Sequence, residues 1–224
     1  MRKRIEHPGV ADGYDRWAQT YDATPNPLVA LDRRHTFGTL DPRPGERVLD
    51  AGCGTGAYLR MLRGARSAPV GLDFSPGMLR MARQMAPEAR VVQADLNRAF
   101  PIRPGIFDAV ISTLVSEHLT NLRSFFLEVY AALRRGGRFV FSAFHPELAR
   151  SGIEANFERD GIEYRLGAEP HTMADYLTYI SDAGFQVLEQ REYSADDKLI
   201  SELPSAAKYG DRPLLAIFRA ERAI

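Results

Sequence analysis

Four features are absent or rare in this chain, and each absence excludes a class of protein. Only one cysteine occurs in 224 residues, so no disulfide can form within the chain, as expected in a reducing cytoplasm. The 29 basic and 29 acidic side chains cancel, which predicts neither nucleic acid nor a membrane surface as partner. No apolar run has the length of a membrane span, and the basic residues 2–4 are not followed by the apolar segment of a signal peptide.

The composition and periodicity of the remaining sequence predict one α/β domain over residues 1–224. With 45% hydrophobic residues the chain can bury a sizeable core, and it contains neither internal repeats nor a low-complexity linker. Strands and helices alternate after residue 40, which favours a doubly wound sheet. The predicted strands are 47–51, 69–73, 89–94, 109–113, 138–144, 185–190 and 213–218.

End signals mark three of the predicted helices. Ser75, followed by a proline, gives an N-cap hydroxyl and a proline at the first helical position. A second helix is predicted to start near Asn121 and to stop at the glycine pair 136–137. Thr172 opens a third helix with a pattern like a capping box, and Gly184 ends it.

A glycine-rich turn follows the first of the predicted strands. Residues 48–56 form an apolar run that reaches Asp50 and then has glycines at alternate positions. Glycines allow the backbone to approach a ligand closely, and the helix predicted after Gly56 points its free N–H groups at that ligand. A second carboxylate, Asp73, closes the next strand. Strand, turn, helix and a strand ending in an acid are the parts with which a doubly wound sheet binds a nucleoside.

Residues 48–56 resemble the first motif of class I S-adenosylmethionine-dependent methyltransferases, an apolar strand and an acid followed by G-x-G-x-G. Dinucleotide dehydrogenases usually space the third glycine one residue further on and lack the acid. The likeness continues, in the family's order and spacing, through 73–75, 92–96, 107–112 and 133–140. Together these segments cover about half of the chain.

The resemblance implies a Rossmann-like sheet of seven strands, mostly parallel, with the last strand antiparallel and inserted beside its neighbour. It also implies S-adenosylmethionine as cofactor and S-adenosylhomocysteine as product. The implied cofactor-binding residues are Tyr21, Asp50, Gly52, Cys53, Gly54, Asp73, Phe74, Met78, Asp95, Leu96 and Thr113.

By the same resemblance, Asp50 compensates the methionyl ammonium, Asp73 takes the two ribose hydroxyls, and Asp95 accepts from the adenine amine. The helix N–H groups after the glycine turn meet the methionyl carboxylate, and Phe74 and Met78 offer apolar faces to the adenine ring. A plainer role stays open for each of the three acids, because carboxylates at strand ends often only cap helices or turns.

The N-terminal segment 1–40 contains an aromatic stripe. Tyr14, Trp17 and Tyr21 fall on one face at helical spacing. Residues 14–22 resemble the Y-D-x-x-A-x-x-Y-D segment that folds as a lid over the cofactor in small-molecule methyltransferases of the quinone-biosynthesis type. Such a stripe is equally typical of core packing, so both interpretations stay open, with Tyr21 and the adjacent Asp22 the better candidates for a cofactor contact.

The implied reaction is transfer of the methyl group to a small-molecule acceptor by in-line displacement, with oxygen the first choice and nitrogen or carbon as alternatives. A general base is needed only where the acceptor carries a proton, as a hydroxyl does. The candidate catalytic residues are His118, His145 and His171, the first two at strand ends where open α/β sheets bind ligands. A lone histidine is nevertheless more often structural, and the spacing of these three matches no metal motif.

Two irregular segments, 145–170 and 193–212, are predicted to carry substrate specificity, because long loops in compact domains usually bind or cover ligands. The weaker candidates for substrate contact are Glu117, Asn156, Glu163, Tyr164 and Arg165. Two other functions stay open: a nucleoside-binding protein that transfers no methyl group, and a dinucleotide-dependent oxidoreductase.

Overall fold

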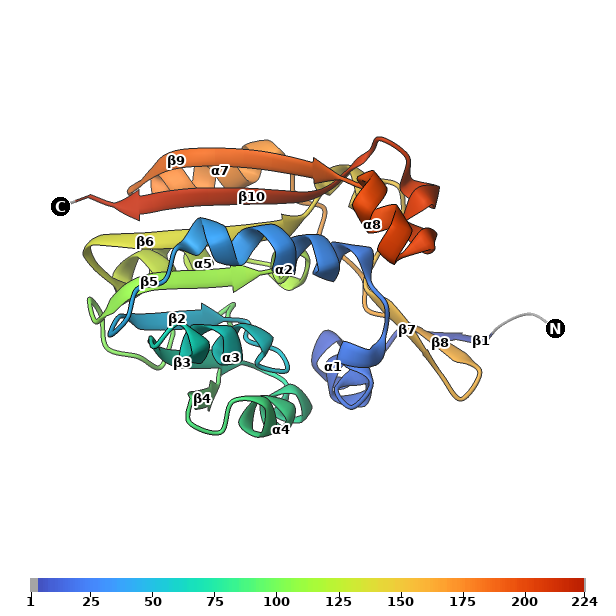
Figure 1. The fold of residues 1–224 in the computed structure, drawn as a ribbon, viewed down its shortest axis with the longest axis horizontal. Coiled ribbons are helices and arrows are strands. Elements are labelled where there is room, and N and C mark those ends of the chain that lie inside the picture. The colour runs from blue at the N-terminus through green and yellow to red at the C-terminus, as the bar shows by residue number, and fades with distance from the viewer. Residues whose placement is uncertain (1–3, 224) are drawn as a thin grey trace.

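The computed structural model describes residues 4–223, so residues 2 and 3 of the basic N-terminal cluster lie outside it. Within this range the main sheet has seven strands in the order β4-β3-β2-β5-β6-β10-β9 (Figure 1). They are β2 (Arg47–Ala51), β3 (Ala68–Asp73), β4 (Arg90–Gln93), β5 (Phe107–Thr113), β6 (Leu133–Phe144), β9 (Phe185–Ser194) and β10 (Pro213–Arg222). Strands β2 to β6 pair in parallel, and β10 is antiparallel to β6 and β9. The predicted seven-strand sheet with its last strand antiparallel is confirmed.

Helices cover both faces of this sheet (Figure 1). They are α1 (Val10–Trp17), α2 (Pro27–Leu40), α3 (Ala57–Gly64), α4 (Pro76–Met85), α5 (Leu122–Ala132), α6 (Pro146–Arg150), α7 (Met173–Asp182) and α8 (Asp197–Glu202), with 3-10 turns η1 (Tyr21–Ala23), η2 (Ser116–His118) and η3 (Pro204–Tyr209). Helices α5 and α7 bury one face, where Phe139 and Phe141 of β6 lie in the core. Helices α2, α3 and α8 bury the opposite face, which contains Val140. No helix of the described residues is long and apolar enough to span a bilayer.

A smaller sheet lies beyond the carboxyl ends of the main strands (Figure 1). In it β7 (Asn156–Arg159) and β8 (Ile162–Arg165) form a hairpin, and β1 (Arg4–Glu6) pairs with β8 in parallel. The hairpin turns through Asp160, with φ 53°, and Gly161, with φ 74°. The sequence predicts only an irregular segment here, although Asp-Gly between two apolar-alternating runs is a hairpin signal. The hairpin packs on α1, where Trp17 and Phe157 stack with ring centroids 5.0 Å apart.

The helix starts agree with the predicted caps, but one helix end does not. Ser75 caps α4 by accepting from the Met78 N–H, and Thr172 forms a capping box at α7. Helix α5 ends at Ala132 and not at the glycine pair 136–137, so that prediction is wrong. The reason is tertiary: Leu133 already pairs with Phe107 of β5. Arg222 of β10 also donates a hydrogen bond to the carbonyl oxygen of Leu133, which satisfies this acceptor at the end of the helix.

Candidate functional site

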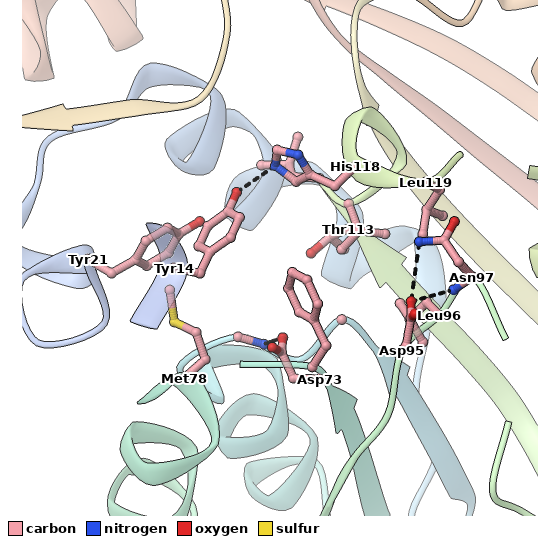
Figure 2. Close-up of a pocket in the computed structure, with 15 residues that line it drawn as sticks. Tyr14, Tyr21, Asp73, Met78, Asp95, Leu96, Asn97, Thr113, His118 and Leu119 are labelled. Carbon is pink, nitrogen blue, oxygen red and sulfur yellow. Dashed lines mark hydrogen bonds between the residues drawn. The ribbon is translucent and has the colours of Figure 1, made fainter. Parts of the chain in front are cut away.

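The carboxyl ends of the central strands open into a pocket, here called the motif pocket (Figure 2). It contains about 640 Å³ of space between atoms, part of which is open to solvent. Its lining residues are Tyr14, Tyr21, Gly52, Gly54, Asp73, Phe74, Met78, Asp95, Leu96, Asn97, Thr113, Leu114, Val115, His118 and Leu119. The motif pocket therefore lies at the sheet edge where open α/β folds bind ligands.

Two glycines of the turn after β2 cannot be replaced without steric conflict. Gly52 has φ +88°, and a Cβ there would lie 2.3 Å from Cγ1 of Val115. Gly56 has φ +87°, and its Cβ would lie 2.9 Å from Cα of Ala82 in α4. Gly52 thus lets the loop after β5 lie against the turn, and Gly56 lets α3 begin against α4. The turn presents backbone rather than side chains to the motif pocket.

Asp73 ends β3 and is held by the glycine turn. Its Oδ2 accepts from the Gly54 N–H at 2.9 Å, and its Oδ1 accepts from the Ser75 N–H at 2.9 Å. Burial raises the pKa of Asp73, and these backbone donors oppose that increase. Each carboxylate oxygen keeps a further lone pair. Asp73 therefore caps the turn, as the plainer interpretation expects, and can also accept hydrogen bonds from ribose hydroxyls.

Asp50 lies in β2 below the same turn and is 1% exposed. Neither of its carboxylate oxygens has a hydrogen-bond partner among residues 4–223. Burial raises the pKa of Asp50, and the neighbouring Asp73 and Asp32 raise it further. A buried carboxylate is costly unless a cation or several donors compensate it. Asp50 does not itself line the motif pocket, but its chemistry fits the methionyl ammonium of S-adenosylmethionine.

Asp32 of α2 is a buried carboxylate that the sequence reading misses. It is 2% exposed and accepts hydroxyl hydrogen bonds from Thr36 at 2.6 Å, Ser142 at 2.6 Å and Tyr58 at 2.7 Å. Burial raises the pKa of Asp32, and these donors lower it. One signal was available, because Asp32 follows Leu28 at the helical spacing of four and so shares its buried face.

Asp95 follows β4 and is bound within its own loop. Its Oδ1 accepts from the backbone and side-chain N–H groups of Asn97, at 3.0 and 3.2 Å. Asn97 in turn accepts from the Thr120 N–H at 2.8 Å, which joins this loop to the one after η2. Asp95 is thus a turn residue that also lines the motif pocket. Asn97, Val115 and Leu119 also line it and were not predicted, since only folding brings their loops together.

Helix α1 is fastened over the motif pocket at two points. The Tyr14 hydroxyl and Nε2 of His118 are 2.9 Å apart and share a hydrogen bond (Figure 2). The Asp15 carboxylate accepts from the Ser75 hydroxyl and from the Gly77 N–H, the latter at 2.7 Å. A carboxylate at the N-terminal end of α4 also interacts favourably with the helix dipole.

The aromatic stripe serves both purposes that the sequence left open. Tyr14 and Tyr21 line the motif pocket, whereas Trp17 is 3% exposed and stacks on Phe157 of the hairpin. The N-terminal segment is therefore at once a cover for the pocket and a small core of its own.

The three predicted histidines lie in different places. His118 lines the motif pocket, and burial lowers its pKa to about 4, so the ring is neutral at physiological pH. His145 caps α6, with Nε2 3.3 Å from Oε2 of Glu192, and His171 bonds the Leu119 carbonyl at 2.7 Å. Neither of these two lines the motif pocket. Within residues 4–223, no group of three or more His, Cys, Asp or Glu side chains is arranged to hold a metal ion.

Most predicted cofactor residues line the motif pocket, but Asp50 and Cys53 do not. Those that do are Tyr21, Gly52, Gly54, Asp73, Phe74, Met78, Asp95, Leu96 and Thr113. Cys53 is 7% exposed and packs with Leu59 and Leu79 in an apolar cluster between α3 and α4. Burial raises the pKa of its thiol, as expected of a small filler rather than a nucleophile.

A second pocket, here called the lid pocket, adjoins the first and shares Tyr14, Tyr21 and Leu114 with it. It contains about 1130 Å³ of space between atoms, including space open to solvent. Its other lining residues are Trp17, Thr24, Pro25, Asn26, Pro27, Leu28, Val29, Glu117, Phe144, Ile153, Glu154, Ala155, Asn156, Phe157, Glu158, Ala168, Ser205, Lys208 and Tyr209. Both irregular segments predicted to carry specificity thus contribute to it. Of the weaker candidates, Glu117 and Asn156 line the lid pocket, and Glu163, Tyr164 and Arg165 do not.

Comparison with known proteins agrees with this geometry. Residues 49–141 match the model of a methyltransferase domain family. The chain is 34% identical over 141 residues to malonyl-[acyl-carrier protein] O-methyltransferase of Serratia marcescens, covering 62% of this chain and 53% of that one. It is 33% identical over 124 residues to an 18S rRNA (guanine-N(7))-methyltransferase of Schizosaccharomyces pombe, covering 50% and 46%. The chain therefore spans about half the length of these curated relatives.

A solved structure extends the likeness to nearly the whole chain. An S-adenosylmethionine-dependent methyltransferase from Mesorhizobium loti superposes with a TM-score of 0.72 at 25% identity, covering 88% of this chain and 100% of that one. The family match lies on the strands and turns that form the motif pocket. The chain therefore contains a methyltransferase domain at residues 49–141 and has the fold of the class I S-adenosylmethionine-dependent methyltransferases.

Proposed function

We propose that this chain, acting as one domain of residues 1–224, transfers the methyl group of S-adenosylmethionine to a small-molecule acceptor, with oxygen the favoured acceptor atom. The observation that carries the proposal is the pair of carboxylates Asp50 and Asp73 on the neighbouring strands β2 and β3, beside the glycine turn. Asp50 is buried without a partner and suits an ammonium group, whereas Asp73 is held by backbone donors and suits hydroxyls.

Different residues of the motif pocket bind different parts of the cofactor. Phe74 and Met78 give apolar faces for the adenine ring, and Asp95, whose Oδ2 also lies 3.4 Å from Nε of the exposed Arg98, accepts from the exocyclic amine. Thr113 and Leu114, at the end of β5, border the methionyl part. When bound, S-adenosylmethionine supplies a methyl carbon made electrophilic by the sulfonium sulfur. The protein has mainly to exclude water and align the acceptor, which is the role of the lid over both pockets.

The lining of the lid pocket supports a small molecule as acceptor. Its charged side chains are three carboxylates, Glu117, Glu154 and Glu158, and one ammonium, Lys208. This balance repels nucleic-acid phosphates, although an rRNA methyltransferase is among the proteins that this chain resembles. Aromatic side chains form part of its walls, between α1 and the β7–β8 hairpin, and aromatic side chains are common in small-molecule sites. The single cysteine supports a reducing, cytoplasmic location.

Titration with S-adenosylhomocysteine by calorimetry tests the cofactor part of this proposal. We expect the wild type to bind, and Asp50→Asn to bind about tenfold or more weakly, because the charge that faces the ammonium is lost. The same substitution removes an unpartnered buried carboxylate, so the free Asp50→Asn chain should be at least as heat-stable as the wild type. The matched control is Asp211→Asn, the same chemical change at an exposed position, which should change neither the affinity for S-adenosylhomocysteine nor the heat stability. A wild type that does not bind S-adenosylhomocysteine contradicts the proposal.

A further inference from the structure

Glu117 has a carboxylate of which one oxygen is left without a partner by the described residues. It lies in η2, just after β5, and lines the lid pocket. Its Oε2 is buried and has no hydrogen-bond partner among the described residues. Glu154, another carboxylate of the same pocket, already accepts from the Gly167 N–H at 2.6 Å. Glu117 therefore lines the lid pocket and carries a buried carboxylate oxygen that no described residue engages.

The groups around Glu117 leave it able to take up a proton near neutral pH. The titratable groups that face it are Tyr14 of α1, Tyr21 of η1, Tyr176 of α7 and Asp32 of α2. Burial raises the pKa of all three tyrosines, so none of them is ionised at neutral pH. Burial raises the pKa of Glu117 to about 7, with a smaller increase from the charge of Asp32 and an opposing effect of the hydrogen bond from its own N–H. A general base is most effective when its pKa lies near the working pH.

The other residues that line the lid pocket indicate which kind of acceptor molecule would bind beside Glu117. Its aromatic side chains come from four separate parts of the chain and are Tyr14, Trp17, Tyr21, Phe144, Phe157 and Tyr209. Rings of this kind bind flat apolar molecules through stacking and edge contacts. Tyr14 and Tyr21 also line the motif pocket, so a ring held against them reaches toward the cofactor side.

From this geometry we infer that the acceptor is a hydroxyl on a flat aromatic ring held in the lid pocket, and that Glu117 is the general base that takes the hydroxyl proton. This inference rests on the proposed methyl transfer and names its substrate class. The O–H bond breaks as the proton passes to the Glu117 carboxylate, and the acceptor oxygen forms a bond to the methyl carbon. The carbon–sulfur bond breaks with its electron pair left on sulfur. The negative carboxylate and the positive sulfonium are thereby both neutralised, and Glu117 later returns its proton to solvent.

His118 is poorly suited to this role although the sequence favours it. Its Nε2 is engaged by the Tyr14 hydroxyl, and burial lowers its pKa to about 4, which makes it a weak base. His118 holds Tyr14, and with it the lid, in place. It is a positioning residue, whereas Glu117 is the residue that contacts the acceptor.

A fluorescent phenol tests this assignment without relying on turnover. The full chain, saturated with S-adenosylhomocysteine, is titrated at pH 8 with 2-naphthol and with 2-methoxynaphthalene, which has the same ring but no proton to donate. We expect the wild type to bind 2-naphthol about tenfold more tightly, the difference that a hydrogen bond to a charged acceptor makes. In Glu117→Gln most of this preference should be lost. Lowering the pH to 6 should weaken the preference in the wild type and leave Glu117→Gln unchanged.

The matched control is Glu147→Gln, the same chemical change on an exposed side chain of α6, which should keep the wild-type preference. Calorimetry with S-adenosylhomocysteine on each variant shows whether the motif pocket is intact. If that ligand binds and 2-naphthol is not preferred, or is preferred equally by Glu117→Gln, the role of Glu117 is overturned while the proposed methyl transfer stands. If S-adenosylhomocysteine does not bind the wild type, both are overturned.

Discussion

The motif pocket and the lid pocket adjoin and share Tyr14 and Tyr21, yet they are built differently. Backbone makes much of the motif pocket: the turn at Gly52 and Gly54, with Asp73 tied to it through N–H groups. Side chains from distant segments make the lid pocket, from α1 to η3. A site built from backbone groups tolerates few residue types at each position. A site built from side chains can change the molecule that it binds through single substitutions. The first suits a fixed cofactor and the second a particular acceptor.

The largest effect should come from Gly52→Ala, which attacks the backbone site. The new Cβ would lie 2.3 Å from Val115 at a φ of +88°, so both strain and overlap oppose it. We expect a loss of about 2–4 kcal/mol in the free energy of unfolding and about 100-fold in affinity for S-adenosylhomocysteine. Gly105→Ala is the matched control, with φ +69° and nothing within 4 Å of its Cβ. It should cost about 1 kcal/mol and leave binding unchanged. Equal effects of the two would contradict the steric account; denaturant melts and calorimetry measure them.

A smaller but more selective effect is expected from Glu117→Gln on methyl transfer to a phenol. The catalytic rate should fall about 100-fold, with little change in affinity for S-adenosylhomocysteine. In the wild type the rate should rise as pH increases through about 7, because the raised pKa of Glu117 keeps its carboxyl protonated below that value. The variant should lose this rise. If the rate of the variant rises with pH by the same amount, another group and not Glu117 is the general base.

Asp15→Ala should affect both pockets, because it loosens the lid that they share. The substitution removes the acceptor of the Ser75 hydroxyl and of the Gly77 N–H at the start of α4. We expect about a tenfold loss in affinity for S-adenosylhomocysteine and for the phenol alike. Asp12→Ala, on the same helix but paired only with the exposed Arg16, is the control and should change neither affinity. An effect on one ligand alone would show that the lid belongs to a single pocket.

The smallest effect concerns the pH dependence of stability through His118. Its pKa is lowered to about 4 by burial, below its value of 6.5 in an unfolded chain. The unfolded state therefore takes up a proton at a higher pH than the folded state does. As a result, the free energy of unfolding decreases as the pH falls from about 6.5 toward 4. We expect His118→Asn to reduce the loss of unfolding free energy between pH 7 and pH 5 by about 1 kcal/mol. His7→Asn, at an exposed histidine, should leave that loss unchanged. Urea titrations at the two pH values measure it.

The parts that could be predicted were those whose signals are local. Apolar runs gave the strands, and Ser75 and Thr172 gave helix starts, because a strand's burial and a helix cap depend on a few consecutive residues. The glycine spacing and Asp73 gave the motif pocket for the same reason. The end of α5 was missed because pairing of Leu133 with β5, far along the chain, decides it.

The sequence by itself determined the alternation of strands and helices and the glycine turn with its acid, since both depend on residue types at fixed short spacings, whereas the seven-strand arrangement came from the family resemblance. Only the tertiary structure decided which acids and histidines share a cavity. It buried Asp32 under hydroxyl donors, turned His145 and His171 into structural partners, and left Glu117 facing the lid pocket. Such outcomes depend on packing between segments more than a hundred residues apart, such as those of Asp32 and Ser142. No local sequence pattern predicts this packing.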